Sequence, residues 1–172
     1  KSEPYNEKDL TSPIGVYGNS KLAGEIAICS SKMKSIIIRT SWLYSNYGHN
    51  FVKTMLKIGA KKENIGVVHD QFGSPTFAHD LANTIIKIVE DKKYTWSTGD
   101  IFHFSNEGSC SWYEFAKEII RLKNLPLKIK RISSKIYTQK TKRPKYSLLD
   151  KSKIKLSFSI SVNHWKISLK NM

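Results

Sequence analysis

The stretch SIIIRTS, residues 35–41, is a continuous β-branched run that ends in an arginine and two hydroxyl residues. An apolar run without polar alternation is typical of a strand that is covered on both faces, as in a parallel sheet. Helical patterns flank it, at residues 17–31 before the run and at residues 50–60 after it. Strands that alternate with helices indicate an α/β protein. The sequence therefore predicts an α/β fold with a largely parallel sheet.

The rest of the chain continues this alternation. Strands are predicted at residues 64–70, 100–106 and 127–133, and helices at residues 78–91, at residues 111–122 and over the end of the chain. In the helix at 78–91, helical spacing leads us to expect Leu81, Ile85, Ile88 and Val89 on the face that meets the core. Ser111 and a glutamate three residues later predict a capping box where the next helix begins.

Composition excludes several classes of protein. The net charge is +15, but 25 of the 29 basic residues are lysines. They are spread along the chain without interleaved aromatics, which favours a solvated surface over a nucleic-acid site and suits an anionic small molecule. No apolar run approaches the ~20 residues that cross a membrane. Cys29 and Cys110 form no C-x-x-C pair and have no histidine cluster, so we expect no metal site and a reducing, cytoplasmic location.

Two Tyr-x-x-x-Lys pairs occur, Tyr17 with Lys21 and Tyr113 with Lys117. Residues four apart share one face of a helix. A phenol is a poor proton donor at neutral pH, because its pKa is about 10. A neighbouring ammonium favours the phenolate and brings proton transfer closer to neutral pH. Such a pair fits protonation of a carbonyl oxygen whose carbon receives a hydride.

The neighbouring residues separate the two pairs. Tyr113 lies within an amphipathic pattern next to Trp112, so a packing role is predicted for it. Tyr17 begins its helix between Gly15 and Gly18, and glycines let another molecule approach closely. Locally, an aromatic that only covers the core at the helix start is an equally good hypothesis for Tyr17.

One expected feature is missing. An α/β fold that binds a dinucleotide normally opens with a strand and a Gly-rich turn. None of the nine glycines forms such a turn, so either the protein binds no dinucleotide or that half precedes Lys1. The polar, charged start without an initiator methionine leads us to expect a chain cut from something longer.

Four blocks carry a resemblance to a known family: PYNEKDLTSPIGVYGNSKLAGE (4–25), IIIRTSWLYSNYGHNFVKTML (36–56), VVHDQFGSPTFAHDLA (67–82) and KRPKYSLLDKSKIK (142–155). Together they resemble the dTDP-4-dehydrorhamnose reductases, of the extended branch of the short-chain dehydrogenase/reductase superfamily. RTSWLY and DQFGSPT, in this order and at this spacing, are far more specific than a Tyr/Lys pair.

The resemblance implies a Rossmann-like domain for NADPH or NADH and a smaller substrate-binding α/β domain. Residues 1–70 would complete the Rossmann-like domain, whose N-terminal strands, about 120 residues, would be missing. Residues 71–172 would mainly bind substrate, with room for segments to return to the Rossmann sheet. The implied reaction reduces the 4-keto group of dTDP-4-dehydro-β-L-rhamnose to give dTDP-L-rhamnose for cell-surface polysaccharide. The chain alone is expected to be inactive, and a homodimer is compatible with the family.

The resemblance also implies roles for residues near the predicted strand end. Tyr17 would protonate the forming 4-hydroxyl, and Lys21 would tune it and hold the nicotinamide ribose, so that both also bind cofactor. Thr40 and Ser41 would face the nicotinamide, at the carboxyl end of a parallel strand where ligands bind. Trp42 would pack on the substrate, with a core position as the alternative.

Three further residues are implied to bind substrate, each with a plain structural alternative. Asn50 would face the diphosphate at a helix start, or serve as an ordinary N-cap. Gln71 lies in a turn at the expected border of the two domains, where glycine and proline also suit a purely structural turn. Arg143 would bind the diphosphate through its planar guanidinium, or remain a solvated charge.

Other functions stay open. An epimerase or dehydratase of the same branch shares Tyr-x-x-x-Lys, although RTSWLY and DQFGSPT fit those enzymes less well. A non-catalytic relative, such as the regulatory β subunit of methionine adenosyltransferase, need not keep Tyr17 and Lys21 together. A nucleic-acid binder would show a steep dependence of affinity on salt.

Overall fold

The prediction of an α/β fold is confirmed by the computed structural model, which describes residues 1, 3–137 and 143–172. Three strand pairs are parallel: β1 (Ile36–Arg39) with β6 (Asp100–His103), β2 (Leu43–Tyr44) with β5 (Thr76–Phe77), and β3 (Asn64–Val68) with β8 (Lys128–Ile132). The fourth pair, β4 (Phe72–Gly73) with β7 (Cys110–Ser111), is antiparallel. All of the longer strands are thus paired in parallel.

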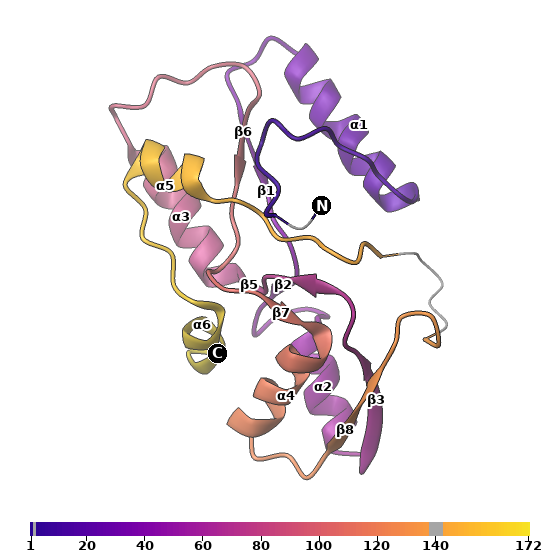
Figure 1. The fold of residues 1–172 in the computed structure, drawn as a ribbon. Coiled ribbons are helices and arrows are strands. Elements are labelled where there is room, and N and C mark those ends of the chain that lie inside the picture. The colour runs from indigo at the N-terminus through magenta and orange to yellow at the C-terminus, as the bar shows by residue number, and fades with distance from the viewer. Residues whose placement is uncertain (2, 138–142) are drawn as a thin grey trace.

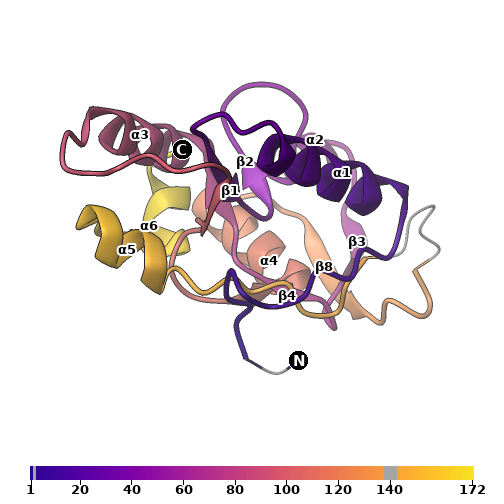
Figure 2. The ribbon, with the colours of Figure 1, turned by 90° about the horizontal axis from the view of Figure 1, so that it is seen from above.

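The helices of the described residues are α1 (Val16–Ser30), α2 (Phe51–Gly59), α3 (Ala78–Glu90), α4 (Trp112–Leu122), α5 (Ser152–Phe158) and α6 (Trp165–Lys170). All but α6 lie beside one of two strand pairs. Figure 1 shows α1, α3 and α5 around β1 and β6, whereas α2 and α4 lie beside β3 and β8. Figure 2, seen from above, places α3 and α5 together on the side away from α1.

Two hydrophobic clusters follow this division. One is built from β6, α3, α5 and the residues after α5, and contains Ile88, Phe102, Phe104, Ile154, Phe158 and Ile160. The other is built mainly from α2, α4 and α6, with Tyr44, Val52, Met55, Val67, Phe77, Cys110, Phe115, Ala116, Ile119, Trp165 and Leu169. The chain passes between the clusters repeatedly: α2, α4 and α6 belong to one cluster, and α3, β6 and α5, which alternate with them along the sequence, belong to the other.

The buried face of α3 differs from the expected one. Thr84 and Ile88 are buried and Leu81 is half-buried, but Ile85 and Val89 are 42% and 63% exposed. Positions 81, 84 and 88 form one stripe at helical spacing, and 85 and 89 lie about 100° further round the helix. Hydrophobicity alone could not distinguish these two adjacent stripes.

The expected cover on both faces of β1 is also incomplete. Its four residues are all half-buried, and α1 buries none of its residues fully. Among the described residues β1 pairs with β6 alone, so its second edge carries no strand. Within the described part of the chain, no helix combines the length and apolar character that crossing a bilayer requires.

Candidate active site

The turn after β1 is joined to the turn before α3 by hydroxyl groups. Thr40 Oγ1 donates to Thr76 Oγ1 at 3.2 Å, and Thr76 Oγ1 donates to the Ser41 carbonyl at 2.6 Å. Ser41 Oγ donates to the Ser74 carbonyl at 2.9 Å. The two segments are therefore hydrogen-bonded together at the carboxyl end of β1, where ligands bind in open α/β sheets. Thr40 is exposed there and Ser41 is half-buried, whereas Ser74 and Thr76 are fully buried. The predicted strand end and the family resemblance led us to expect Thr40 and Ser41 there, but not their hydrogen bonds to Thr76 and Ser74.

Tyr17 and Lys21 lie on the open side of α1. Tyr17 is 72% exposed and Lys21 is exposed, whereas Gly18 and Leu22, one position further along, are half-buried. The alternative in which Tyr17 covers the core is therefore wrong. A Cβ on Gly18 would lie 2.9 Å from Pro13 Cβ, so this glycine admits the preceding segment of its own chain.

An ion pair fastens α1 to the end of β1. Arg39 donates from Nε to Glu25 Oε1 at 2.9 Å and from Nη2 to Oε2 at 2.6 Å. Hydrogen bonding to the Glu25 carboxylate raises the pKa of Arg39 above its usual value. Arg39 directly precedes Thr40, and Glu25 lies two helical turns after Tyr17, so the pair sets α1 against the polar turn. Sequence reasoning missed it, although a lone charge closing an apolar run was a usable signal.

Trp42 and Arg143, distant in sequence, meet at a third side chain. The Trp42 ring stacks on Trp112, with centroids 3.6 Å apart and planes 10° from parallel. The Arg143 guanidinium carbon lies 5.7 Å from the centroid of the same Trp112 ring. One face of Trp42 is thus occupied by protein, so a substrate could contact only its remaining surface. Trp112 was predicted only as a neighbour of a packing tyrosine.

Asn50 and Gln71 have contrasting environments. Asn50 Oδ1 accepts from the Lys53 N–H at 3.1 Å, and Nδ2 donates to the Ser45 carbonyl at 2.8 Å. The N-cap alternative is confirmed for Asn50. Gln71 is 4% exposed, and its Oε1 has no hydrogen-bond partner among the described residues. A buried acceptor without a donor is costly, so Gln71 is the more unusual of the two.

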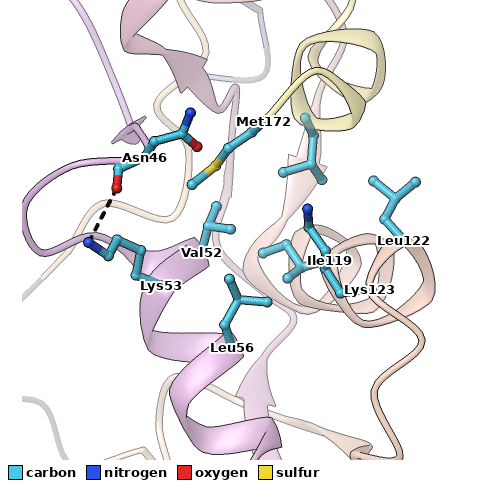
Figure 3. A pocket seen from close by; sticks show the side chains of 9 residues that line it. Asn46, Val52, Lys53, Leu56, Ile119, Leu122, Lys123 and Met172 are labelled. Atoms are coloured by element: carbon cyan, nitrogen blue, oxygen red, sulfur yellow. Dashed lines mark hydrogen bonds between the residues drawn. The ribbon is translucent and has the colours of Figure 1, made fainter.

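A separate pocket of about 180 Å³ lies between α2, α4 and α6. It is lined by Asn46, Val52, Lys53, Leu56, Ile119, Leu122, Lys123, Leu169 and Met172. Figure 3 shows apolar side chains from α2 and α4 facing one another across it, with Met172 entering from above. None of the predicted site residues lines this pocket.

Parallel strand pairs, with helices packed beside them and a polar turn at the carboxyl end of β1, define a Rossmann-like α/β protein. The family described as RmlD substrate binding domain matches residues 1–172. The chain belongs to this family.

Its relatives are similar over nearly the whole chain. A dTDP-4-dehydrorhamnose reductase of Aggregatibacter actinomycetemcomitans is 41% identical over 100% of this chain and 61% of its own length. A spore coat polysaccharide biosynthesis protein of Bacillus subtilis is 42% identical over 98% of this chain and 57% of its own length. The crystal structure of a dTDP-4-dehydrorhamnose reductase from Bacillus anthracis, in complex with NADP, is 39% identical with a TM-score of 0.90, over 99% of this chain and 59% of that one. The chain thus spans about 60% of the length of these relatives.

Proposed function

We propose that the chain is the proton-donating and substrate-binding portion of an NAD(P)H-dependent dTDP-4-dehydrorhamnose reductase. The observation that carries the proposal is the open Tyr17–Lys21 face on α1, which Glu25 and Arg39 fasten to the polar turn after β1. Membership of the RmlD family supports it, as does the reductase from Bacillus anthracis, whose structure holds NADP.

The chemistry needs a hydride and a proton. Bound NADH or NADPH supplies the hydride to C4 of the keto sugar. As the C=O π bond breaks, the Tyr17 hydroxyl gives its proton to the developing alkoxide, and the resulting phenolate regains a proton from solvent. The Lys21 ammonium, one helical turn away, stabilises that phenolate and has N–H donors left for the nicotinamide ribose.

The residues present fit the nicotinamide end of such a cofactor. The Thr40 and Ser41 hydroxyls lie at the carboxyl end of β1, where a doubly wound sheet receives its ligand. No Gly-rich turn for a pyrophosphate occurs in the sequence. We therefore assign residues 1–70 to the later part of a cofactor domain, and residues 71–172 mainly to substrate binding.

The sugar nucleotide is proposed to lie along Trp42, Asn50, Gln71 and Arg143. The stack with Trp112 supports a shared surface for Trp42 and Arg143. The orphaned Gln71 Oε1 suits a donor group of the ligand, such as a sugar hydroxyl. The ring centroids of Phe51 and Trp112 are 4.6 Å apart. Asn50 directly precedes Phe51, so the backbone of Asn50 lies near the surface that Trp42 and Arg143 share.

The test uses a protein that joins this chain to the amino-terminal portion of the Bacillus anthracis relative. We predict that Tyr17→Phe lowers turnover of dTDP-4-dehydrorhamnose by about 10²–10⁴-fold, the usual contribution of general acid catalysis. NADPH binding should be nearly unchanged, because the phenol ring remains.

Tyr113→Phe is the matched control, since it removes the hydroxyl of the second Tyr-x-x-x-Lys pair. That ring packs under Arg131 at 4.9 Å, a contact that phenylalanine keeps, so turnover should be retained. Undiminished turnover in Tyr17→Phe would refute the acid role.

A further inference from the structure

We propose that Trp112 is a positioning residue for the sugar nucleotide: its ring stacks on Trp42 and makes a cation–π contact with Arg143, so that an indole and a guanidinium meet the ligand together. This inference rests on the proposed function, which places Trp42 and Arg143 at the substrate. Trp112 itself is the first residue of α4 and is half-buried. Sequence patterns assign it no role beyond packing.

Trp42 is held in an unfavourable backbone conformation. Its φ is +48°, in the left-handed region that a bulky residue seldom adopts. Such a conformation persists only where the surroundings impose it. Here Trp112 covers one face of the ring, and Gly73 lies against its edge, where an added Cβ would be 2.6 Å from Trp42 Cε2.

Arg143 reaches Trp112 because the segment after it is anchored to β4. Phe72 N–H donates to the Lys145 carbonyl at 2.8 Å, and Ser147 N–H donates to the Phe72 carbonyl at 2.9 Å. β4 pairs in turn with β7, which directly precedes Trp112. The backbone thus places the guanidinium near the indole without any side-chain contact of the arginine to a carboxylate among the described ion pairs.

A guanidinium over an indole keeps its in-plane N–H donors free. The cation is attracted to the ring face, while the donors at its edge remain available for a bidentate contact to phosphate. The ligand that this arrangement fits is a nucleoside diphosphate group, with a sugar or base against the exposed part of Trp42. Trp112 acts on both contacts without touching the ligand.

The experiment measures binding of thymidine diphosphate to this chain by isothermal titration calorimetry. Trp112→Leu should raise the Kd about tenfold, because the stacking and cation–π contacts together are worth about one factor of ten. Trp112→Phe keeps an aromatic face and should recover part of that loss. Trp96→Leu is the matched control, since Trp96 is half-buried in the other cluster, and its Kd should match that of the unchanged chain.

A second pair of variants distinguishes positioning from folding. Arg143→Lys keeps the charge but loses the planar guanidinium. Its effect on Kd should be less than additive with that of Trp112→Leu, because both changes weaken the contact between Arg143 and Trp112. In the joined protein, Trp112→Leu should raise KM with kcat unchanged.

The outcomes separate this inference from the proposed function. Equal Kd values for Trp112→Leu and Trp96→Leu, or additive effects with Arg143→Lys, overturn the positioning role while leaving the reductase proposal intact. Lack of any thymidine diphosphate binding by the unchanged chain overturns both the positioning role and the proposed substrate. The acid role of Tyr17 is judged separately, by turnover.

Discussion

His103 is a buried titratable side chain at the end of β6. It is 1% exposed, its backbone N–H donates to Glu7 Oε1 at 2.9 Å, and its Nδ1 lies 3.0 Å from the Tyr5 carbonyl. A carbonyl only accepts, so Nδ1 carries a proton. Nε2 has no partner among the described residues. Burial lowers the pKa of His103 below its usual value, against the opposing effect of Glu7.

This lowered pKa makes stability depend on pH in a defined direction. The unfolded chain binds a proton near the usual histidine pKa of 6.5, but the folded chain does so only at lower pH. The stabilising contribution is therefore complete above 6.5 and is lost as the pH falls through the folded pKa. We predict that the free energy of unfolding decreases between about pH 7.5 and about pH 5.5, measured by urea denaturation.

His103→Gln should flatten that pH dependence, because it removes the titrating group. His49→Gln is the control, since His49 is exposed. An unchanged slope in His103→Gln would show that another group is responsible.

At the scale of single elements, α4 illustrates how local chemistry begins a helix. The predicted capping box is confirmed: Ser111 Oγ accepts from the Glu114 N–H at 3.2 Å, and Glu114 Oε2 accepts from the Ser111 N–H at 2.7 Å. Each contact satisfies a backbone donor that the first turn leaves without a helical partner. The cap also fixes the start of the helix that carries Trp112.

We predict that Ser111→Ala lowers the free energy of unfolding by about 1 kcal/mol, the usual cost of losing an N-cap side chain. The measurement is thermal or urea unfolding followed by circular dichroism. Ser157→Ala, at an exposed position within α5, should change the stability little. A loss of the same size in both variants would contradict the capping role.

At the scale of the whole molecule, Asn106 connects the two hydrophobic clusters. It is fully buried, and its Oδ1 accepts from the Phe77 N–H at 2.8 Å. Its Nδ2 donates to Asp80 Oδ2 of α3 at 2.6 Å and to Ser168 Oγ of α6 at 2.9 Å. One amide therefore bonds to α3, to β5, which directly precedes α3, and to α6, which is far from both in the chain.

Asn106→Asp should destabilise the fold by more than about 3 kcal/mol, because it places a second carboxylate against Asp80 where a donor stood. Asn106→Ala should cost less, about 1–3 kcal/mol for the groups left unpaired. Urea denaturation ranks the two variants, with exposed Asn83→Asp on α3 as the control. The connecting role is contradicted if alanine is as harmful as aspartate.

Much of the element order was predictable from local pattern. The β-branched run at 35–41 became β1, the helical spacing at 50–60 became α2, and the cap at Ser111 began α4. These features depend on residues within a few positions of one another, so they can be predicted from periodicity and capping chemistry. For the same reason, Tyr17 and Lys21 could be placed on one helix face.

The chain by itself thus determined its main helices, its longer strands, its α/β class and the residues that end β1, but not the short strands β2, β4, β5 and β7. Only the tertiary structure decided that α3 buries Thr84 rather than Ile85, that Glu25 pairs with Arg39, and that Trp112 contacts both Trp42 and Arg143. Those contacts join segments that are far apart in the sequence and are brought together by crossover connections and by the packing of helices on strands. Their geometry depends on how the helices are rotated against the strands, and a periodic pattern along one segment does not carry that information.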